Sequence, residues 1–121
     1  MSTPSHSQAA LERLPLRAGV LAVLAALGNG PAPGIAILEQ VEAAGRGARV
    51  LGPGTLYRLL RELRAEGLIA RTEAPEREGE GDERRQFHAL THLGRAVLEA
   101  EAARLRRTLA DSGLLAPGPG G

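Results

Sequence analysis

The sequence predicts a mainly α-helical fold with one small β-hairpin, and three observations support this prediction. Residues 52–68 carry leucines at the i, i+3, i+4 and i+7 spacing that marks one buried face of a helix. Two short strand candidates, residues 68–72 and 84–90, flank a polar stretch broken by glycine and proline, which is typical of a hairpin. Hydrophobic residues make up 43% of the chain but aromatic residues only 2%, so the core must be aliphatic.

Length and composition exclude several classes of protein. A chain of 121 residues has the length of one domain with a modest core. The absence of cysteine excludes disulfides and thiolate chemistry, and it removes the best ligand of zinc sites. The longest apolar run, residues 18–27, is well short of the roughly 20 residues that a membrane span needs. The first residues also lack the basic-then-apolar order of a signal peptide, so we expect a cytoplasmic protein without a membrane partner.

The N-terminal part of the chain predicts a leader and two helices. Residues 1–10 are small and polar, and we expect a disordered leader there, followed by the folded domain at residues 11–90. A first helix is marked by one apolar face, and the dense turn signals of residues 28–34 end it. That segment matches no phosphate-binding glycine pattern, so a phosphate loop is a poor alternative. A short second helix begins at Ile35 and ends at Ala44.

The third helix follows and has two different sides. Pro53 suits its first turn and Gly67 ends it as a C′ glycine. Arg58 and Arg61 lie opposite the leucine face, with the chain's single tyrosine, Tyr57, on one shoulder. The first turn adds two small residues that can approach an anion, Gly54 and Thr55. This side suits nucleic-acid binding, although an ordinary solvated surface helix is equally compatible with these residues alone.

The order of the elements predicts a winged helix-turn-helix. A helix, a short connection and an arginine-bearing helix form the helix-turn-helix, and the hairpin after it is the wing. Thr91 then caps a last helix within residues 91–112, and we expect it to form a homodimer. The alternative is that this helix packs back on its own domain. Residues 113–121 are rich in glycine and proline, and we expect a disordered tail. The expected dimer seam has residues spaced four, three and four apart: Leu98, Ala102, Leu105 and Leu109.

Charge is unevenly distributed along the chain, although the net charge is only +1. Residues 46–71 hold six arginines against two glutamates, whereas residues 73–83 hold six acidic residues against one arginine. All fifteen basic residues are arginine, which we attribute to genomic base composition and therefore discount as support for phosphate binding.

No catalytic or metal site is predicted. His88 and His92 are four residues apart, but Thr91 starts a helix between them, so they need not share a face. We interpret both as ordinary surface histidines. No serine, histidine and carboxylate pattern indicates nucleophilic catalysis, so we expect neither an enzyme nor a cofactor.

Three sequence blocks resemble the PadR family of bacterial transcriptional regulators. Residues 53–69, PGTLYRLLRELRAEGLI, resemble the family's Thr-Leu-Tyr helix ending in Glu-Gly-Leu-Ile. Residues 84–95, RRQFHALTHLGR, resemble the arginine-rich strand that runs into Leu-Thr-x-x-Gly-Arg, and residues 34–37, GIAI, resemble Gly-Tyr-Glu-Ile. The match covers roughly residues 16–101. Ile35 and Phe87 stand where the family commonly has tyrosine, and Arg58 replaces a common proline. Glu62 and Arg64 reverse the family's usual order of a basic and then an acidic residue, and the wing tip is unusually acidic.

The resemblance implies a dimeric repressor acting on the nucleoid. Two recognition helices would enter successive major grooves of a pseudo-palindromic operator in double-stranded DNA. Members are often released by small-molecule effectors, but this chain has no tryptophan to line such a pocket. The alternative is a protein-interaction module, which would suit the acidic wing. The expected DNA contacts are Gly54, Thr55, Tyr57, Arg58, Arg61, Arg84 and Arg85.

Overall fold

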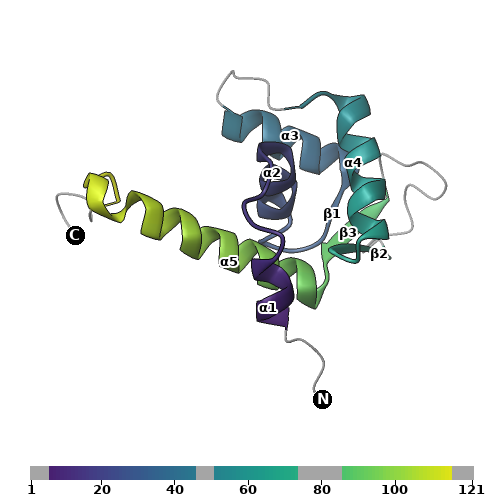
Figure 1. Ribbon diagram of the computed structural model, residues 1–121. Coiled ribbons are helices and arrows are strands. Elements are labelled where there is room, and N and C mark those ends of the chain that lie inside the picture. Colours follow the sequence, from purple (N-terminus) through teal and green to yellow (C-terminus); the bar gives the residue numbers. More distant parts are fainter. Residues whose placement is uncertain (1–5, 46–50, 74–85, 116–121) are drawn as a thin grey trace, which may run out of the picture.

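The computed structural model describes residues 6–45, 51–73 and 86–115, and it is mostly helical with a small antiparallel sheet (Figure 1). The predicted fold class is therefore confirmed. The elements in chain order are α1 (His6–Leu11), α2 (Ala18–Ala26), β1 (Ala32–Pro33), α3 (Gly34–Gly45), α4 (Pro53–Ala65), β2 (Ile69–Thr72), β3 (Phe87–Leu90), α5 (His92–Leu109) and the 3-10 turn η2 (Ala110–Ser112).

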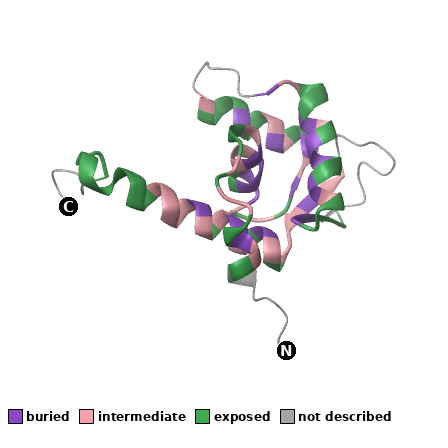
Figure 2. Cartoon of the chain, viewed as in Figure 1, coloured by how far each residue is buried: buried purple, intermediate pink, exposed green. Residues whose placement is uncertain are grey.

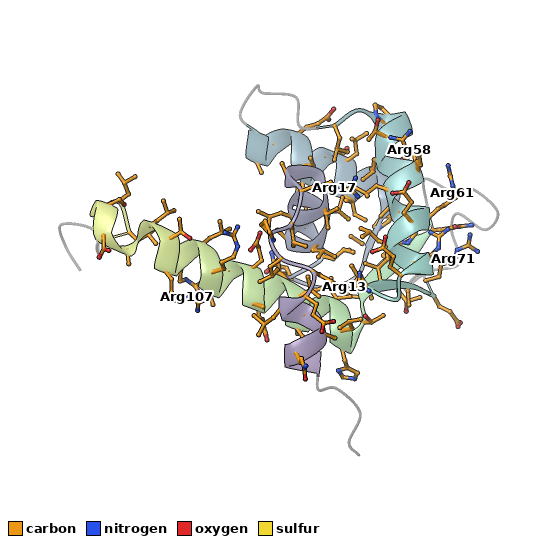
Figure 3. The ribbon with its side chains drawn as sticks, in the orientation of Figure 1. Arg13, Arg17, Arg58, Arg61, Arg71 and Arg107 are labelled. Carbon is orange, nitrogen blue, oxygen red and sulfur yellow. The ribbon has the colours of Figure 1, made fainter. Side chains whose placement is uncertain are left out.

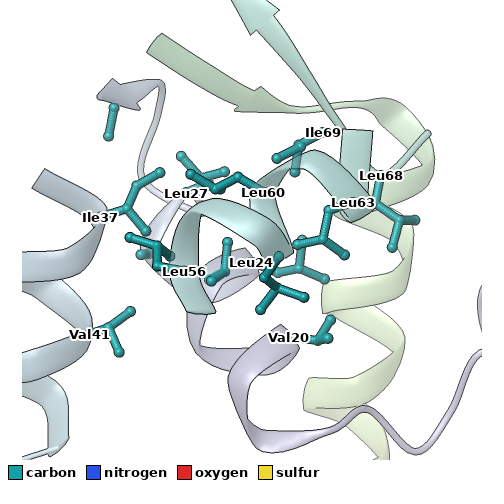
Figure 4. Packing of buried hydrophobic residues seen from close by; sticks show 14 of the residues in the cluster. Val20, Leu24, Leu27, Ile37, Val41, Leu56, Leu60, Leu63, Leu68 and Ile69 are labelled. Carbon is teal, nitrogen blue, oxygen red and sulfur yellow. The ribbon is translucent and has the colours of Figure 1, made fainter. Parts of the chain in front are cut away.

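The core is an aliphatic cluster between α2, α3 and α4 (Figure 4). The leucine face of α4 is buried as its spacing predicts, and Leu56 and Leu60 are fully buried. Removing each such side chain from water stabilises the fold by about 1.5–3 kcal/mol, which orients α4 with its other side outward. The residues that meet α4 from the neighbouring helices are Leu24, Leu27, Ile37 and Val41.

The sheet contains one strand that the sequence pattern does not predict. β2 and β3 form the expected antiparallel hairpin, with Ile69 opposite Leu90. β1 pairs with the other edge of β3, within the segment that we expected to contain only turns. Pro33 is tolerated there because β1 is an edge strand. β3 is therefore the central strand, and His88 is fully buried in it, so the interpretation of His88 as a surface histidine is wrong. His92 is exposed.

The first helix corrects the prediction of a disordered leader. Residues 6–11 form α1, which packs against α5, and Ala10 is completely buried (Figure 1). Short polar sequences have little helix-forming tendency alone, so this helix depends on its contact with α5. Residues 1–5 lie outside the described part of the chain.

α5 starts against the domain and then extends away from it (Figures 1 and 2). Thr91 caps it as predicted, since the Thr91 hydroxyl accepts a hydrogen bond from the Gly94 N–H at 2.9 Å. The same hydroxyl donates to the Gly67 carbonyl at 2.6 Å, which joins the start of α5 to the end of α4. From Arg106 onward α5 and the residues after it are exposed.

A buried carboxylate joins α5 to the connection between α1 and α2. Glu101 is only 1% exposed, and its Oε2 accepts the Leu16 N–H at 2.9 Å. Its other partner is the Arg104 guanidinium, which donates to both carboxylate oxygens. The hydrogen bonds from Arg104 and Leu16 lower the pKa of Glu101 although burial opposes them. The periodic pattern gave no sign of this residue's role.

Across the described ranges, no helix combines the length and apolar character that crossing a bilayer requires.

Candidate nucleic-acid interface

The outward side of α4 holds the five DNA contacts predicted on this helix. Gly54, Thr55, Arg58 and Arg61 are exposed, while Tyr57 is half-buried and packs partly against the core. Arg58 and Arg61 project away from the body of the domain (Figure 3). The tertiary structure thus places these residues on one surface.

The start of α4 can be approached closely by a ligand. Gly52 is the N-cap residue and Pro53 occupies the first turn, and no side chain caps the helix. The N–H groups of the first turn therefore lack an intrahelical or side-chain acceptor and carry the positive end of the helix dipole. A Cβ atom at Gly54 would meet nothing within 4 Å, so the backbone there is open.

The cations of this surface come from more than one element. The Arg58 Nε lies 4.0 Å from the Glu62 Oε2, and both side chains are about half exposed or more. Such an exposed pair contributes little stability, so Arg58 can exchange Glu62 for a phosphate at small cost. Arg71 on β2 is exposed and lies on the same side as Arg58 and Arg61 (Figure 3).

Arg71 is not among the DNA contacts predicted from the sequence, and the predicted contacts of the wing are not tested by the structure. Arg84 and Arg85, together with the acidic residues from Glu76 to Glu83, lie outside the described residues. The signal of Arg71 in the sequence is its place in the first strand of the hairpin, two residues after the Glu-Gly-Leu-Ile that resembles the family.

The expected dimer seam divides into two parts. Leu98 packs against its own domain, because its Cδ2 lies 3.5 Å from the position of a Cβ at Gly28. The alternative that the last helix packs back on its own domain therefore applies to Leu98, the first residue of the seam. Ala102 and Leu105 are half-buried, and Leu109 is 37% exposed.

Solved structures of other proteins share this fold. RosR of H. salinarum is 27% identical, with a TM-score of 0.60 over 86% of this chain and 84% of that chain. A PadR family transcription regulator from Clostridium difficile is 22% identical, with a TM-score of 0.60 over 78% of this chain and 93% of that one. BpsR of Bordetella bronchiseptica, whose DNA binding is regulated by 6-hydroxynicotinic acid, is 22% identical. Its TM-score is 0.58 over 95% of this chain and 73% of that chain. No curated protein matches the chain in sequence.

The family comparison covers the helix-turn-helix, the wing and the start of α5. The model of the transcriptional regulator PadR-like family matches residues 23–100, which is more than half of the chain. Members of this family regulate transcription by binding DNA and are not enzymes. The chain belongs to the PadR-like family of transcriptional regulators.

Proposed function

We propose that this protein is a sequence-specific repressor that binds a pseudo-palindromic operator as a homodimer, with α4 as its recognition helix. The observation that carries the proposal is that α4 has two different faces. One is a buried leucine face, and the other is exposed and carries two arginines and a first turn of small side chains. A helix held in this way can enter a major groove without disturbing the core.

The contacts divide by chemistry. Arg58, Arg61 and Arg71 provide guanidinium groups for backbone phosphates, which supply affinity and register. Tyr57, near the start of α4, is proposed to meet base edges, which supply specificity, and the Thr55 hydroxyl is proposed to meet a phosphate. Gly54 lets the backbone approach the DNA. By the family resemblance, Arg84 and Arg85 add phosphate contacts from the wing.

A second copy of the chain supplies the second recognition helix. The distal part of α5 presents Ala102, Leu105 and Leu109, and α1 adds Leu11, which is 58% exposed. Covering this surface with the same surface of a partner gives a two-fold dimer, which matches a two-fold operator. Such a dimer on nucleoid DNA would repress by occupying the promoter.

We include release of the protein from DNA by a small molecule in the proposal, because members of the family that it resembles are often released in this way. The support is that 6-hydroxynicotinic acid regulates DNA binding in the structural neighbour BpsR. The test is a screen of small aromatic acids for release of the protein from its selected operator.

Selection from a random duplex pool, followed by titration over a series of salt concentrations, tests DNA binding. We expect an enriched site with two inverted half-sites and a steep fall of affinity with salt. The alternative, a winged helix that binds only proteins, predicts no enrichment and almost no binding to any duplex. A single enriched half-site bound by a monomer would contradict the homodimer.

A further inference from the structure

A hollow of about 390 Å³ lies between the first turns of α2 and α4. It borders the outward face of α4, with which it shares Thr55 and Arg58, and α2 supplies its other wall. The polar residues that line it are Arg17, Thr55, Arg58 and Glu62.

Close packing brings the starts of the two helices together. A Cβ atom at Gly19 would stand 3.0 Å from the Leu51 Cδ2 and 3.6 Å from the Leu59 Cδ2. Because glycine has no side chain, the first turn of α2 can lie directly against these leucines. Arg17, the N-cap residue of α2, thereby lines the same hollow as Thr55 and Arg58.

The polar groups of the hollow favour one singly charged anion. Arg17 and Arg58 bring two positive charges and Glu62 one negative charge, so the three side chains together carry +1. Thr55 adds a hydroxyl that can donate a hydrogen bond. The N-terminal ends of α2 and α4 carry the positive ends of their helix dipoles, which add positive potential. No side-chain cap occupies the N–H groups of either end. Within the described ranges the Arg17 side chain takes part in no ion pair.

We propose that this hollow holds a phosphodiester group of the DNA backbone, bound by Arg17, Arg58 and Thr55. A phosphodiester carries one negative charge, which matches the net charge of the hollow better than a phosphate dianion does. The inference rests on the proposed function, in which α4 enters a major groove. The DNA strand that borders this groove would then lie against the start of α2. Arg17 then becomes a DNA contact that lies outside the helix-turn-helix and the wing.

The first test compares Arg17→Gln, Arg17→Lys and the wild type on operator and random duplexes over a series of salt concentrations. Arg17→Gln should weaken binding to both duplexes by the same factor, on the order of tenfold, and lower the salt slope by about 1 per contact or about 2 per dimer. Arg17→Lys keeps the charge and should retain the wild-type slope. Arg17 is exposed, so the melting temperature should not change.

Arg107→Gln is the matched control. Arg107 is also an exposed arginine on a helix, but it lies far from the hollow on the distal part of α5 (Figure 3). This variant should keep both the affinity and the slope. If Arg17→Gln behaves like Arg107→Gln, the inference is wrong while DNA binding by the wild type still supports the proposed function. If the wild type itself binds no duplex, the proposed function is wrong instead.

A second test identifies the bound group. Neutral methylphosphonates are introduced one at a time along each strand of the operator. Neutralising one particular phosphate in each half-site should weaken binding of the wild type but not of Arg17→Gln. Such non-additivity between the substitution and the neutralised phosphate is what a direct contact produces. A loss by Arg17→Gln that depends on base sequence would mean that Arg17 contacts a base edge, and it would overturn the phosphate assignment. If no backbone phosphate depends on Arg17, but inorganic phosphate at constant ionic strength stabilises the wild type and not Arg17→Gln, the hollow binds a free ion and the phosphodiester assignment is wrong.

Discussion

The backbone of Gly94 lies so close to the carbonyl oxygen of Leu68 that a Cβ atom at Gly94 would stand 1.9 Å from it. The same carbonyl accepts the Thr91 N–H at 3.1 Å, so the start of α5 is seated directly on the first residue after the α4–β2 turn. This contact joins the end of α4 to the helix that is proposed to form the dimer.

Gly94→Ala should therefore destabilise the fold by at least about 1–3 kcal/mol, because the backbone of Leu68 has to move away. Thermal unfolding measures the effect. Gly54→Ala is the matched control, since it is also a helical glycine but has nothing within 4 Å of the added Cβ. That variant should be stabilised by up to about 1 kcal/mol. Equal melting temperatures for the two variants would contradict the close contact at Gly94.

Glu101→Gln should lower the melting temperature by several degrees at neutral pH, because the buried hydrogen bonds to Leu16 and Arg104 lose the negative charge. The pKa of Glu101 is lowered in the folded state from its ordinary value of 4.5. The stabilisation is therefore fully present above that value and is lost as the pH falls through the folded-state pKa. The difference in melting temperature between the wild type and Glu101→Gln should become smaller below about pH 4.5. Glu99→Gln, at an exposed position of the same helix, should show no such difference.

Arg61→Ala should weaken DNA binding while leaving the fold intact. Arg61 is exposed on the side of α4 opposite the buried leucines, so little packing is lost. The loss of one phosphate contact should reduce the salt slope by about 1 per half-site, or about 2 per dimer. Titration of a labelled operator over several salt concentrations measures it. An unchanged slope would remove Arg61 from the interface.

Leu105→Glu should give a monomer that keeps its helical spectrum but loses operator affinity. In a two-fold dimer the substitution places two carboxylates in the proposed seam without disturbing the chain's own buried core. Arg107→Glu is the control, because Arg107 lies on roughly the opposite side of α5 and the substitution changes the charge by two units instead of one. Sedimentation velocity distinguishes the species. A wild type that sediments as a monomer at micromolar concentration would contradict the dimer.

The sequence by itself determined the elements whose causes are local. The leucine spacing of residues 56–63 predicts α4 and its buried face, Thr91 predicts the start of α5, and Gly67 predicts the end of α4. Each of these depends on hydrogen bonds or periodicity within a few residues, which a pattern can express. The same local blocks carry the family resemblance, and the family model confirms it.

Tertiary structure decided the features that join distant parts of the chain. α1 forms because α5 covers it, β1 forms because β3 offers a free edge, and His88 is buried because β3 becomes central. Glu101 meets Leu16 across 85 residues, and Arg17 and Arg58 line one hollow only because the start of α2 lies near the start of α4. A sequence pattern of short period cannot encode such contacts, because they depend on how the helices pack rather than on which residues are neighbours in the chain.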